Sequence, residues 1–217
     1  MINLFGPKIP NDIYVACSGG IDSMAALTFL ANKPYRKVTA AFFNHGTADS
    51  ANAQWFLEGY LPANYPNIKL VVGDVKDAVR AQRVSGESPE EFWRNKRYEF
   101  LHGLNGPVIM AHHLDDCIEN WMFTAMHGNP HVIPYRNKNV VRPFLTTPKS
   151  ELTGWCLRHK VFWAEDASND NEHYPRNRIR KSILPEVRKI NPGIAKVVAR
   201  KVEEGLLSYP HIEPTNV

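Results

Sequence analysis

The sequence predicts a doubly wound α/β fold built on a mainly parallel sheet, with a small helical extension towards the C-terminus. Two observations lead to this prediction. Short and nearly continuous apolar runs are typical of strands that are buried on both faces of a parallel sheet. Helical patterns separate these runs along residues 1–130, so strands and helices alternate. Beyond residue 130 the alternation gives way to irregular sequence and then to helical patterns rich in basic residues.

Each expected element has local support in the sequence. The apolar runs predict strands over residues 13–17, 38–43, 68–72 and 108–111. The third helix has the clearest start, because a serine cap at Ser88 precedes a proline at the first helical position. The expected helices run from Asp22 to before Pro34, near residues 50–61, from Ser88-Pro89 onwards, from the His112-His113 pair towards Gly128, and from Thr147-Pro148 to about residue 159.

The composition is that of a globular protein. Of its 217 residues, 43% are hydrophobic and 22% charged, which suits one domain with a sizeable core. We expect no membrane span and no secretory signal, because the apolar runs are short and the N-terminus lacks a basic segment before a long apolar one. The three cysteines are widely spaced and form no CxxC pair, which argues against a disulfide framework. We therefore expect a cytoplasmic protein.

Positive charge is concentrated near the C-terminal end. Residues 176–201 contain nine basic residues and one acidic residue, a local charge of +8, so at +4 overall the rest carries −4. Such a segment is either a footprint for a nucleic-acid backbone or a solvated helix face, and composition does not separate the two. We expect an α/β core over residues 1–130, a helical extension with this basic end over 131–207, and a flexible tail over 208–217.

The segment SGGIDS, residues 18–23, lies between an expected strand and an expected helix. Serine hydroxyls, backbone N–H groups and glycines at a helix start can surround a phosphate. Asp22 would repel phosphates unless a divalent cation stands between them, so we assign it as a Mg²⁺ ligand. The segment has no Walker lysine, which indicates that the γ-phosphate is not the group transferred. The alternative is an ordinary glycine-rich turn with a helix cap.

A second polar segment, HHLDDCIEN, opens the helix after the fourth expected strand. Residues at i, i+3, i+4 and i+7 of a helix share one face. This spacing would place His112, Asp115, Asp116 and Glu119 on one face of the helix. Three carboxyl groups on one stripe repel one another, so a metal ion or an amine-bearing substrate should meet them. A solvated acidic face with two capping histidines is the alternative, and the spacing does not decide which cation is involved.

Several segments together resemble a known family. SGGIDS resembles the SGGxDS loop of the PP-loop ATP pyrophosphatases, which cleave ATP between the α- and β-phosphates. Within that group the match narrows to the tRNA(Ile)-lysidine synthase family. AHHLDDCIEN, FNHGTADS, WRNKRYEFL, VRPFL and EDASNDNEHYPRNRIRKSILP are similar to its segments HHxxDDQxET, NHGLRxxS, ARxxRYxxL, RPLL and EDxSNxDxxYxRNxIRxxLLP. These segments occur in the family's order from residue 15 to residue 185.

The resemblance implies an ATP-dependent tRNA modification with ATP and Mg²⁺ as cofactors. The family joins L-lysine to C2 of cytidine 34 in the tRNA(Ile) with a CAU anticodon. ATP first adenylates the C2 oxygen, and lysine then displaces AMP. Free L-lysine and that tRNA are therefore the expected partners.

The resemblance also implies roles for individual residues. The ATP and pyrophosphate site would comprise Ser18, Gly19, Gly20, Ile21, Asp22, Ser23 and His45, with Asp22 holding the metal. The catalytic residues would be Asp22, Arg94, His112 and Asp116, with Arg94 neutralising charge at the α-phosphate. The lysine site would comprise His112, Asp116 and Glu119. Contacts with RNA or ATP would come from Arg176, Asn177, Arg178 and Arg180.

The chain also departs from the family pattern. Ala48, Cys117 and Asn120 stand where the family usually has Arg, Gln and Thr. Family members usually continue into C-terminal domains that help to hold the tRNA, whereas this sequence matches a short form. Its tRNA recognition would rest on the anticodon loop and the basic end, or on a protein partner. Two alternatives remain: a PP-loop enzyme that thiolates tRNA, and a nucleotide- or RNA-binding module without catalysis.

Overall fold

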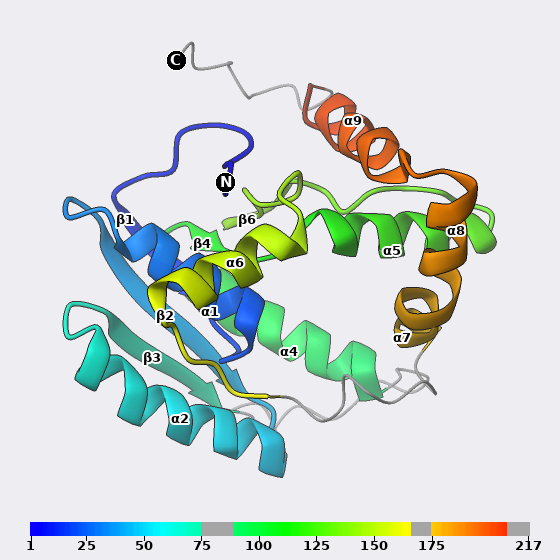
Figure 1. Ribbon diagram of the computed structural model, residues 1–217. Helices are drawn as coiled ribbons and strands as arrows, with labels where there is room; N and C mark the ends of the chain where they lie inside the picture. The colour runs from blue at the N-terminus through cyan, green and yellow to red at the C-terminus, as the bar shows by residue number, and fades with distance from the viewer. Residues whose placement is uncertain (75–88, 166–174, 208–217) are drawn as a thin grey trace.

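A six-stranded sheet forms the centre of the computed structural model, which describes residues 1–74, 89–165 and 175–207 (Figure 1). The strand order is β3-β2-β1-β4-β6-β5, and every pair is parallel except β5 with β6. This arrangement confirms the predicted mainly parallel sheet. The strands are β1 (Asp12–Ala16), β2 (Lys37–Asn44), β3 (Lys69–Asp74), β4 (Val108–Ile109), β5 (Arg136–Asn137) and β6 (Val140–Val141).

Helices cover both faces of this sheet and continue beyond it. Those that lie against the sheet are α1 (Ile21–Ala31), α2 (Ala48–Asn64), α4 (Pro89–Gly103) and α6 (Lys149–His159). The others are α5 (Leu114–Met126), α7 (Pro175–Arg178), the π-helical turn η2 (Ile179–Ile183), α8 (Leu184–Ile190) and α9 (Ile194–Leu207). None of the helices in these described segments is long and apolar enough to cross a membrane.

Strand β1 shows why the central apolar runs are continuous. Its residues Ile13 and Val15 pack with α1, α2 and α6 on one face, whereas Tyr14 and Ala16 pack with α4 on the other. Both faces of the sheet are therefore covered by helices, so both sets of side chains must be apolar. The two packed layers fix the carboxyl ends of the strands relative to the helices that follow them.

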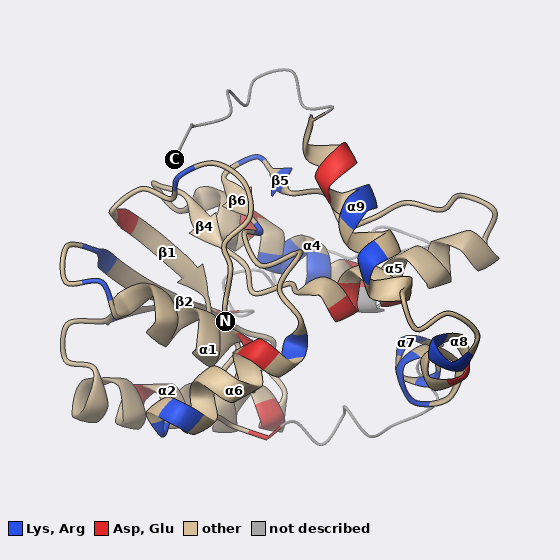
Figure 2. Cartoon of the chain, turned by 45° about the horizontal axis from the view of Figure 1, so that its top comes forward, with Lys and Arg blue, Asp and Glu red and all other residues tan. Residues whose placement is uncertain are grey.

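A separate apolar core holds the helical part together. Leu114 and Ile118 of α5 pack against Leu184 of α8 and against Val198 and Val202 of α9. Helices α7 and α8 lie beside α5, away from the sheet, and Figure 2 shows basic residues gathered on them. The predicted helical C-terminal part is thus present. Part of the range 131–207 nevertheless extends the sheet, because it includes β5 and β6.

Several element ends differ from the predicted ones. Helix α2 begins earlier than predicted because the Thr47 side chain accepts a hydrogen bond from the Ser50 N–H at 3.2 Å. Helix α5 begins at Leu114, so His112 precedes the helix instead of belonging to it. The predicted cap at Ser88 and the predicted tail over 208–217 lie outside the described residues.

Candidate active site at the carboxyl edge of the sheet

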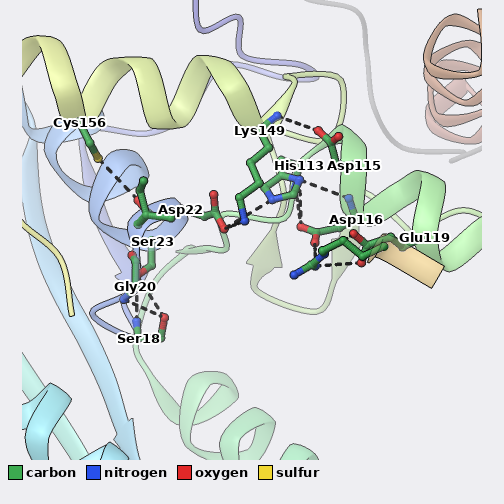
Figure 3. Close-up of polar contacts among 12 residues, drawn as sticks. Ser18, Gly20, Asp22, Ser23, His113, Asp115, Asp116, Glu119, Lys149 and Cys156 are labelled. Carbon is green, nitrogen blue, oxygen red and sulfur yellow. Dashed lines mark hydrogen bonds and ion pairs between the residues drawn. The ribbon is translucent and has the colours of Figure 1, made fainter. Parts of the chain in front are cut away.

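Two polar segments meet where neighbouring parallel strands end. Strand β1 leads into the SGGIDS loop, and the adjacent strand β4 leads into the start of α5. Figure 3 shows the loop residues on one side of Asp22 and the acidic residues of α5 on the other. The closest link between the two segments joins His113 Nε2 to Asp22 Oδ2 at 3.5 Å. The structure therefore brings together the two segments that the sequence analysis singled out.

The loop is held in shape by the Ser23 hydroxyl. It accepts a hydrogen bond from the Ser18 N–H at 3.1 Å and donates one to the Gly20 carbonyl at 2.8 Å. Gly19 adopts a φ of 83°, which strongly favours glycine. Gly20 is the N-cap of α1 and brings no side chain, so the N–H groups of the first turn face the loop interior without a side-chain cap. This geometry suits an anion such as a phosphate.

Asp22 lies between the loop and α5 and carries a charge at neutral pH. Burial opposes its ionisation, but His113 and Lys149 outweigh that effect and hold the pKa of the carboxyl below its usual value. Its Oδ2 lies 3.3 Å from Lys149 Nζ. Its Oδ1 is buried and has no hydrogen-bond partner in the described part of the chain. A carboxylate oxygen left in this state suits a divalent cation that takes its other ligands from phosphates and water.

His113 caps α5 and supports Asp22 at the same time. Its Nδ1 accepts a hydrogen bond from the Asp116 N–H at 3.2 Å, while Asp116 Oδ2 accepts one from the His113 N–H at 2.9 Å. This reciprocal cap leaves the Nε2 proton directed towards Asp22. Burial disfavours protonation of the second ring nitrogen, but Asp22 and Asp116 outweigh it and raise the pKa of His113. The sequence analysis did not assign this residue.

The acidic pair on α5 already holds a cation from the chain itself. Glu119 is only 3% exposed and accepts two hydrogen bonds from Arg180, at 2.6 Å from Nε and 2.9 Å from Nη2. Asp116 lies 3.7 Å from the same guanidinium. Arg180 belongs to the π-helical turn η2, a type of turn that is frequent at functional sites. The cation that contacts Asp116 and Glu119 in the structure is therefore the guanidinium group of Arg180.

Asp115 makes different contacts from those of Asp116 and Glu119. Its Oδ2 accepts a hydrogen bond from the backbone N–H of Lys149 at 2.8 Å, at the start of α6. Its Oδ1 accepts one from Arg188 Nη2 at 2.9 Å. Asp115 therefore connects α5 to α6 and α8, and both its oxygens are engaged.

His112 lies in a cationic surrounding, apart from the acidic stripe on which it was predicted. Its Nδ1 accepts a hydrogen bond from Arg142 Nε at 3.1 Å. Burial, followed by the charges of Arg142 and Arg97, lowers the pKa of His112 to about 3. Because the helix begins after His113, the predicted four-residue face keeps only its three carboxylates. His112 remains part of the site edge as a neutral imidazole.

Two arginines on α4, Arg94 and Arg97, interact electrostatically with His112. Arg94 and Arg97 both lie over the Tyr98 ring, with guanidinium carbons 5.8 and 6.0 Å from its centroid. Arg97 Nε and His45 Nδ1 are buried and have no hydrogen-bond partner among the described residues. Burial, followed by the charge of Arg97, lowers the pKa of His45. His45 and Arg97 thus interact electrostatically, and a water or ligand atom would satisfy their two buried nitrogen atoms.

The basic segment of α7 and η2 lies next to the far end of α5. The Arg176 guanidinium carbon is 5.6 Å from the centroid of the Phe123 ring. A groove of about 780 Å³ between α5 and η2 is lined by residues that include Phe123, His127 and Arg178. Asn177 lies in the same short helix and is half-buried. Of the four predicted RNA- or ATP-contacting residues, Arg180 therefore reaches the acidic pair, Arg178 lines the groove, and Arg176 lies over the Phe123 ring.

Comparisons with known proteins find a matching family and related sequences. A family model described as the PP-loop domain matches residues 1–187. The tRNA(Ile)-lysidine synthase of Legionella pneumophila (strain Lens) is 30% identical over 202 residues, which cover 87% of this chain and 45% of that protein. The tRNA(Ile)-lysidine synthase of Staphylococcus aureus (strain COL) is 31% identical over 208 residues, which cover 86% and 46%. This chain thus spans less than half the length of these relatives.

A solved structure shows the same fold. The U34-tRNA thiolase NcsA from Methanococcus maripaludis, with its 4Fe-4S cluster, matches 97% of this chain and 74% of its own with a TM-score of 0.68. The sequence identity is 18%, so the likeness concerns the fold alone.

Proposed function

The chain belongs to the PP-loop domain family, and on that premise we propose that it is an ATP-dependent ligase that forms lysidine in tRNA. Its substrates would be ATP, L-lysine and a tRNA(Ile) with a CAU anticodon. One observation carries the proposal. An anion-binding loop and a carboxylate pair that already accepts a cationic side chain share one site, joined through the contact between Asp22 and His113.

The loop would hold the pyrophosphate part of ATP. Ser18, Gly19, Gly20, Ile21 and Ser23 would surround the phosphates with hydroxyl and backbone N–H groups, and His45 would lie at the nucleotide's edge. Asp22 would hold Mg²⁺, which would neutralise phosphate charge when bound. Its buried Oδ1 without a partner supports this assignment.

The chemistry requires ATP because the oxygen on cytosine C2 is a poor leaving group. Transfer of AMP to that oxygen, with loss of pyrophosphate, converts it into a good one. Arg94 would neutralise the negative charge that develops at the α-phosphate. The amine of lysine then attacks C2, the bond from C2 to the oxygen breaks, and AMP leaves with that oxygen. Only the neutral amine is nucleophilic, so the ammonium group would give up one proton before the attack and a second after the C–N bond forms. Asp116 is the proposed base that would pass these protons to solvent.

The lysine substrate would enter at the acidic pair. The guanidinium of Arg180 shows that Asp116 and Glu119 can bind a side-chain cation in this geometry. An ammonium group of lysine would take that place, and neutral His112 would lie at the border of the pocket. Once displaced, Arg180 would join Arg176, Asn177 and Arg178 in contacting the RNA strand or ATP, which would explain the basic end next to α5.

The deciding experiment combines the protein with ATP, L-lysine and tRNA(Ile) carrying the CAU anticodon, followed by digestion to nucleosides and mass spectrometry. We expect cytidine 34 to gain a lysyl group and labelled ATP to yield AMP and pyrophosphate. The same tRNA with a GAU anticodon serves as the control. Unmodified cytidine in the presence of bound tRNA, or formation of ADP, would reject the proposal.

Thiolation of tRNA is the second candidate, because the structurally similar NcsA is a thiolase. The three cysteines speak against it. Burial raises the pKa of Cys17 and Cys156 to about 11 and that of Cys117 to about 12, so the thiols stay protonated at neutral pH. Within the described segments, no group of three or more His, Cys, Asp or Glu side chains could hold a metal. Sulfur incorporation into the tRNA would favour this candidate instead.

Binding without turnover is the remaining alternative. A module that only binds nucleotide and RNA would give ATP binding without AMP release in the same assay. The chain keeps Asp22, Arg94, Asp116 and Glu119, which favours catalysis because simple binding would not need this full set.

A further inference from the structure

The phosphate loop contains an acidic residue and no basic one, and the structure places a lysine beside it from another element. Lys149 Nζ lies 3.3 Å from Asp22 Oδ2. Lys149 is the first residue of α6, far from the loop in sequence. No local motif therefore marks it as a phosphate contact, and none of the roles proposed above includes it.

The base of the Lys149 side chain is fixed while its tip stays accessible. Its backbone N–H donates to Asp115 Oδ2 at 2.8 Å. Helix α6 is anchored on α1 by a hydrogen bond from Trp155 Nε1 to Thr28 Oγ1 at 3.0 Å. The Lys149 side chain is nonetheless 38% exposed. A fixed backbone with a mobile ammonium group on a four-carbon stem suits a residue that changes partner.

The charges around Asp22 indicate which partner Lys149 would leave and which it would gain. Lys149 Nζ and His113 Nε2 both lie beside the same oxygen of Asp22, and the lysine ammonium group is the full positive charge of the two. A divalent cation on Asp22 would satisfy the carboxylate and repel the ammonium group of Lys149. The nearest new anion for that group would be the polyphosphate on the loop.

We propose that Lys149 supplies the phosphate-binding cation that the SGGIDS loop lacks, and that it contacts the pyrophosphate part of ATP. This inference rests on the proposed use of ATP. Asp115 is then a positioning residue, because it holds the backbone of Lys149 at the start of α6. The ammonium group exchanges Asp22 for phosphate oxygens on binding, and it stays with the pyrophosphate as that group departs from AMP.

Pyrophosphate binding, measured by isothermal titration calorimetry, tests this role without turnover. The experiment must first distinguish two roles of Lys149, a counter-ion to Asp22 only and a direct contact with phosphate. We therefore compare Asp22→Asn with Asp22→Asn/Lys149→Gln in EDTA, where the carboxylate charge and the metal are both absent. Loss of a charge-assisted hydrogen bond should weaken pyrophosphate binding by at least about tenfold in the double variant. Equal affinities would overturn the inference.

A second experiment adds Mg²⁺. Under this condition the two possible roles of Lys149 predict opposite changes in pyrophosphate affinity. With Mg²⁺ present, Lys149→Gln should bind pyrophosphate more weakly than the wild type, and Lys149→Arg should restore binding to within about threefold. A lysine that merely competed with the metal would give tighter binding when removed, and that result would also overturn the inference. Lys33→Gln, at the exposed turn after the other end of α1, is the matched control and should bind normally.

The outcomes distinguish this inference from the proposed function. If the wild type binds no pyrophosphate with or without Mg²⁺, both fail. If lysidine forms but Lys149→Gln binds pyrophosphate normally, only the inference fails. If pyrophosphate binding depends on Lys149 but no lysidine forms, the phosphate contact stands and the proposed reaction falls.

Discussion

Replacing Glu119 by glutamine tests whether the acidic pair on α5 is the pocket for the lysine substrate. Glutamine keeps the shape of the side chain but removes the charge that now binds Arg180 at 2.6 Å. An ammonium group in that place would lose a charge-assisted hydrogen bond, about 1.5–3 kcal/mol. Asp116 stays close to the same cation, at 3.7 Å in the Arg180 contact, so the lower end of that range applies. Arg180 loses the same partner and becomes easier to displace, which offsets part of this loss, so we expect the KM for lysine to rise about 3- to 10-fold, with little change in kcat.

The assay follows pyrophosphate release against lysine concentration at saturating ATP and tRNA. Glu58→Gln is the matched control, because Glu58 is exposed on α2 and accepts a hydrogen bond only from Gln54 among the described contacts. Thermal denaturation checks that the Glu119 variant is folded, since the ion pair with Arg180 also supports the packing of η2 on α5. An unchanged KM for lysine would refute the assignment. A parallel rise in the KM for ATP would refute it as well, because the effect would then not be specific to the amine pocket.

Three further predictions concern the loop and its surroundings. Asp22→Asn should abolish AMP formation and leave the melting temperature within a few degrees, and undiminished turnover would refute its metal-binding role. Gly19→Ala should destabilise the fold by about 1–2 kcal/mol and weaken ATP binding, because alanine is strained at a φ of 83°; denaturant unfolding measures the first effect, and an unchanged midpoint would contradict it. The free energy of unfolding should fall by about 1–2 kcal/mol through His112 between pH 7 and pH 5, because the unfolded state binds a proton near pH 6.5 whereas the folded pKa is about 3. His112→Asn, which keeps an acceptor for Arg142, should show a flatter dependence on pH, and identical curves would contradict the assignment.

The parts of the site that follow a strand directly could be predicted from the sequence. SGGIDS and HHLDDCIEN each come after a buried strand and open a helix, and the carboxyl ends of parallel strands meet at one edge of a sheet. That rule brings Asp22 close to α5 without any knowledge of side-chain contacts. The fold class was predictable for the same reason, since burial on both faces makes the central strands continuously apolar.

Spacing alone failed where the start of the helix mattered. The i, i+3, i+4 pattern placed His112 on the acidic face, but the reciprocal cap between His113 and Asp116 starts the helix at Leu114. His113 therefore faces Asp22, and His112 faces Arg142. Serine, threonine, aspartate and asparagine are the usual N-caps, so the sequence suggested capping histidines only as an alternative, and His113 is the one that caps the helix.

Contacts between distant segments could not be predicted at all. Lys149 meets Asp22 only because α6 packs on α1, and Arg180 meets Glu119 across 61 residues because η2 packs on α5. Neither Lys149 nor Arg180 lies in a local sequence pattern that predicts its partner. The identity of the cation on the acidic face was open in the sequence for this reason.

These internal contacts mean that ligand binding at the site is an exchange of partners. Asp22 is already paired with Lys149, and Glu119 is already paired with Arg180. Leaving the buried Glu119 side chain without its cationic partner would carry a large desolvation cost, so these contacts help to keep the site formed. An incoming metal or ammonium group must displace one of them, and its affinity is the difference between two favourable contacts. The displaced side chains are basic and lie next to the site, so they become available to phosphate groups at the moment the substrates bind. The basic side chains that stabilise the acidic residues of the site would therefore also bind the polyphosphate and the RNA strand.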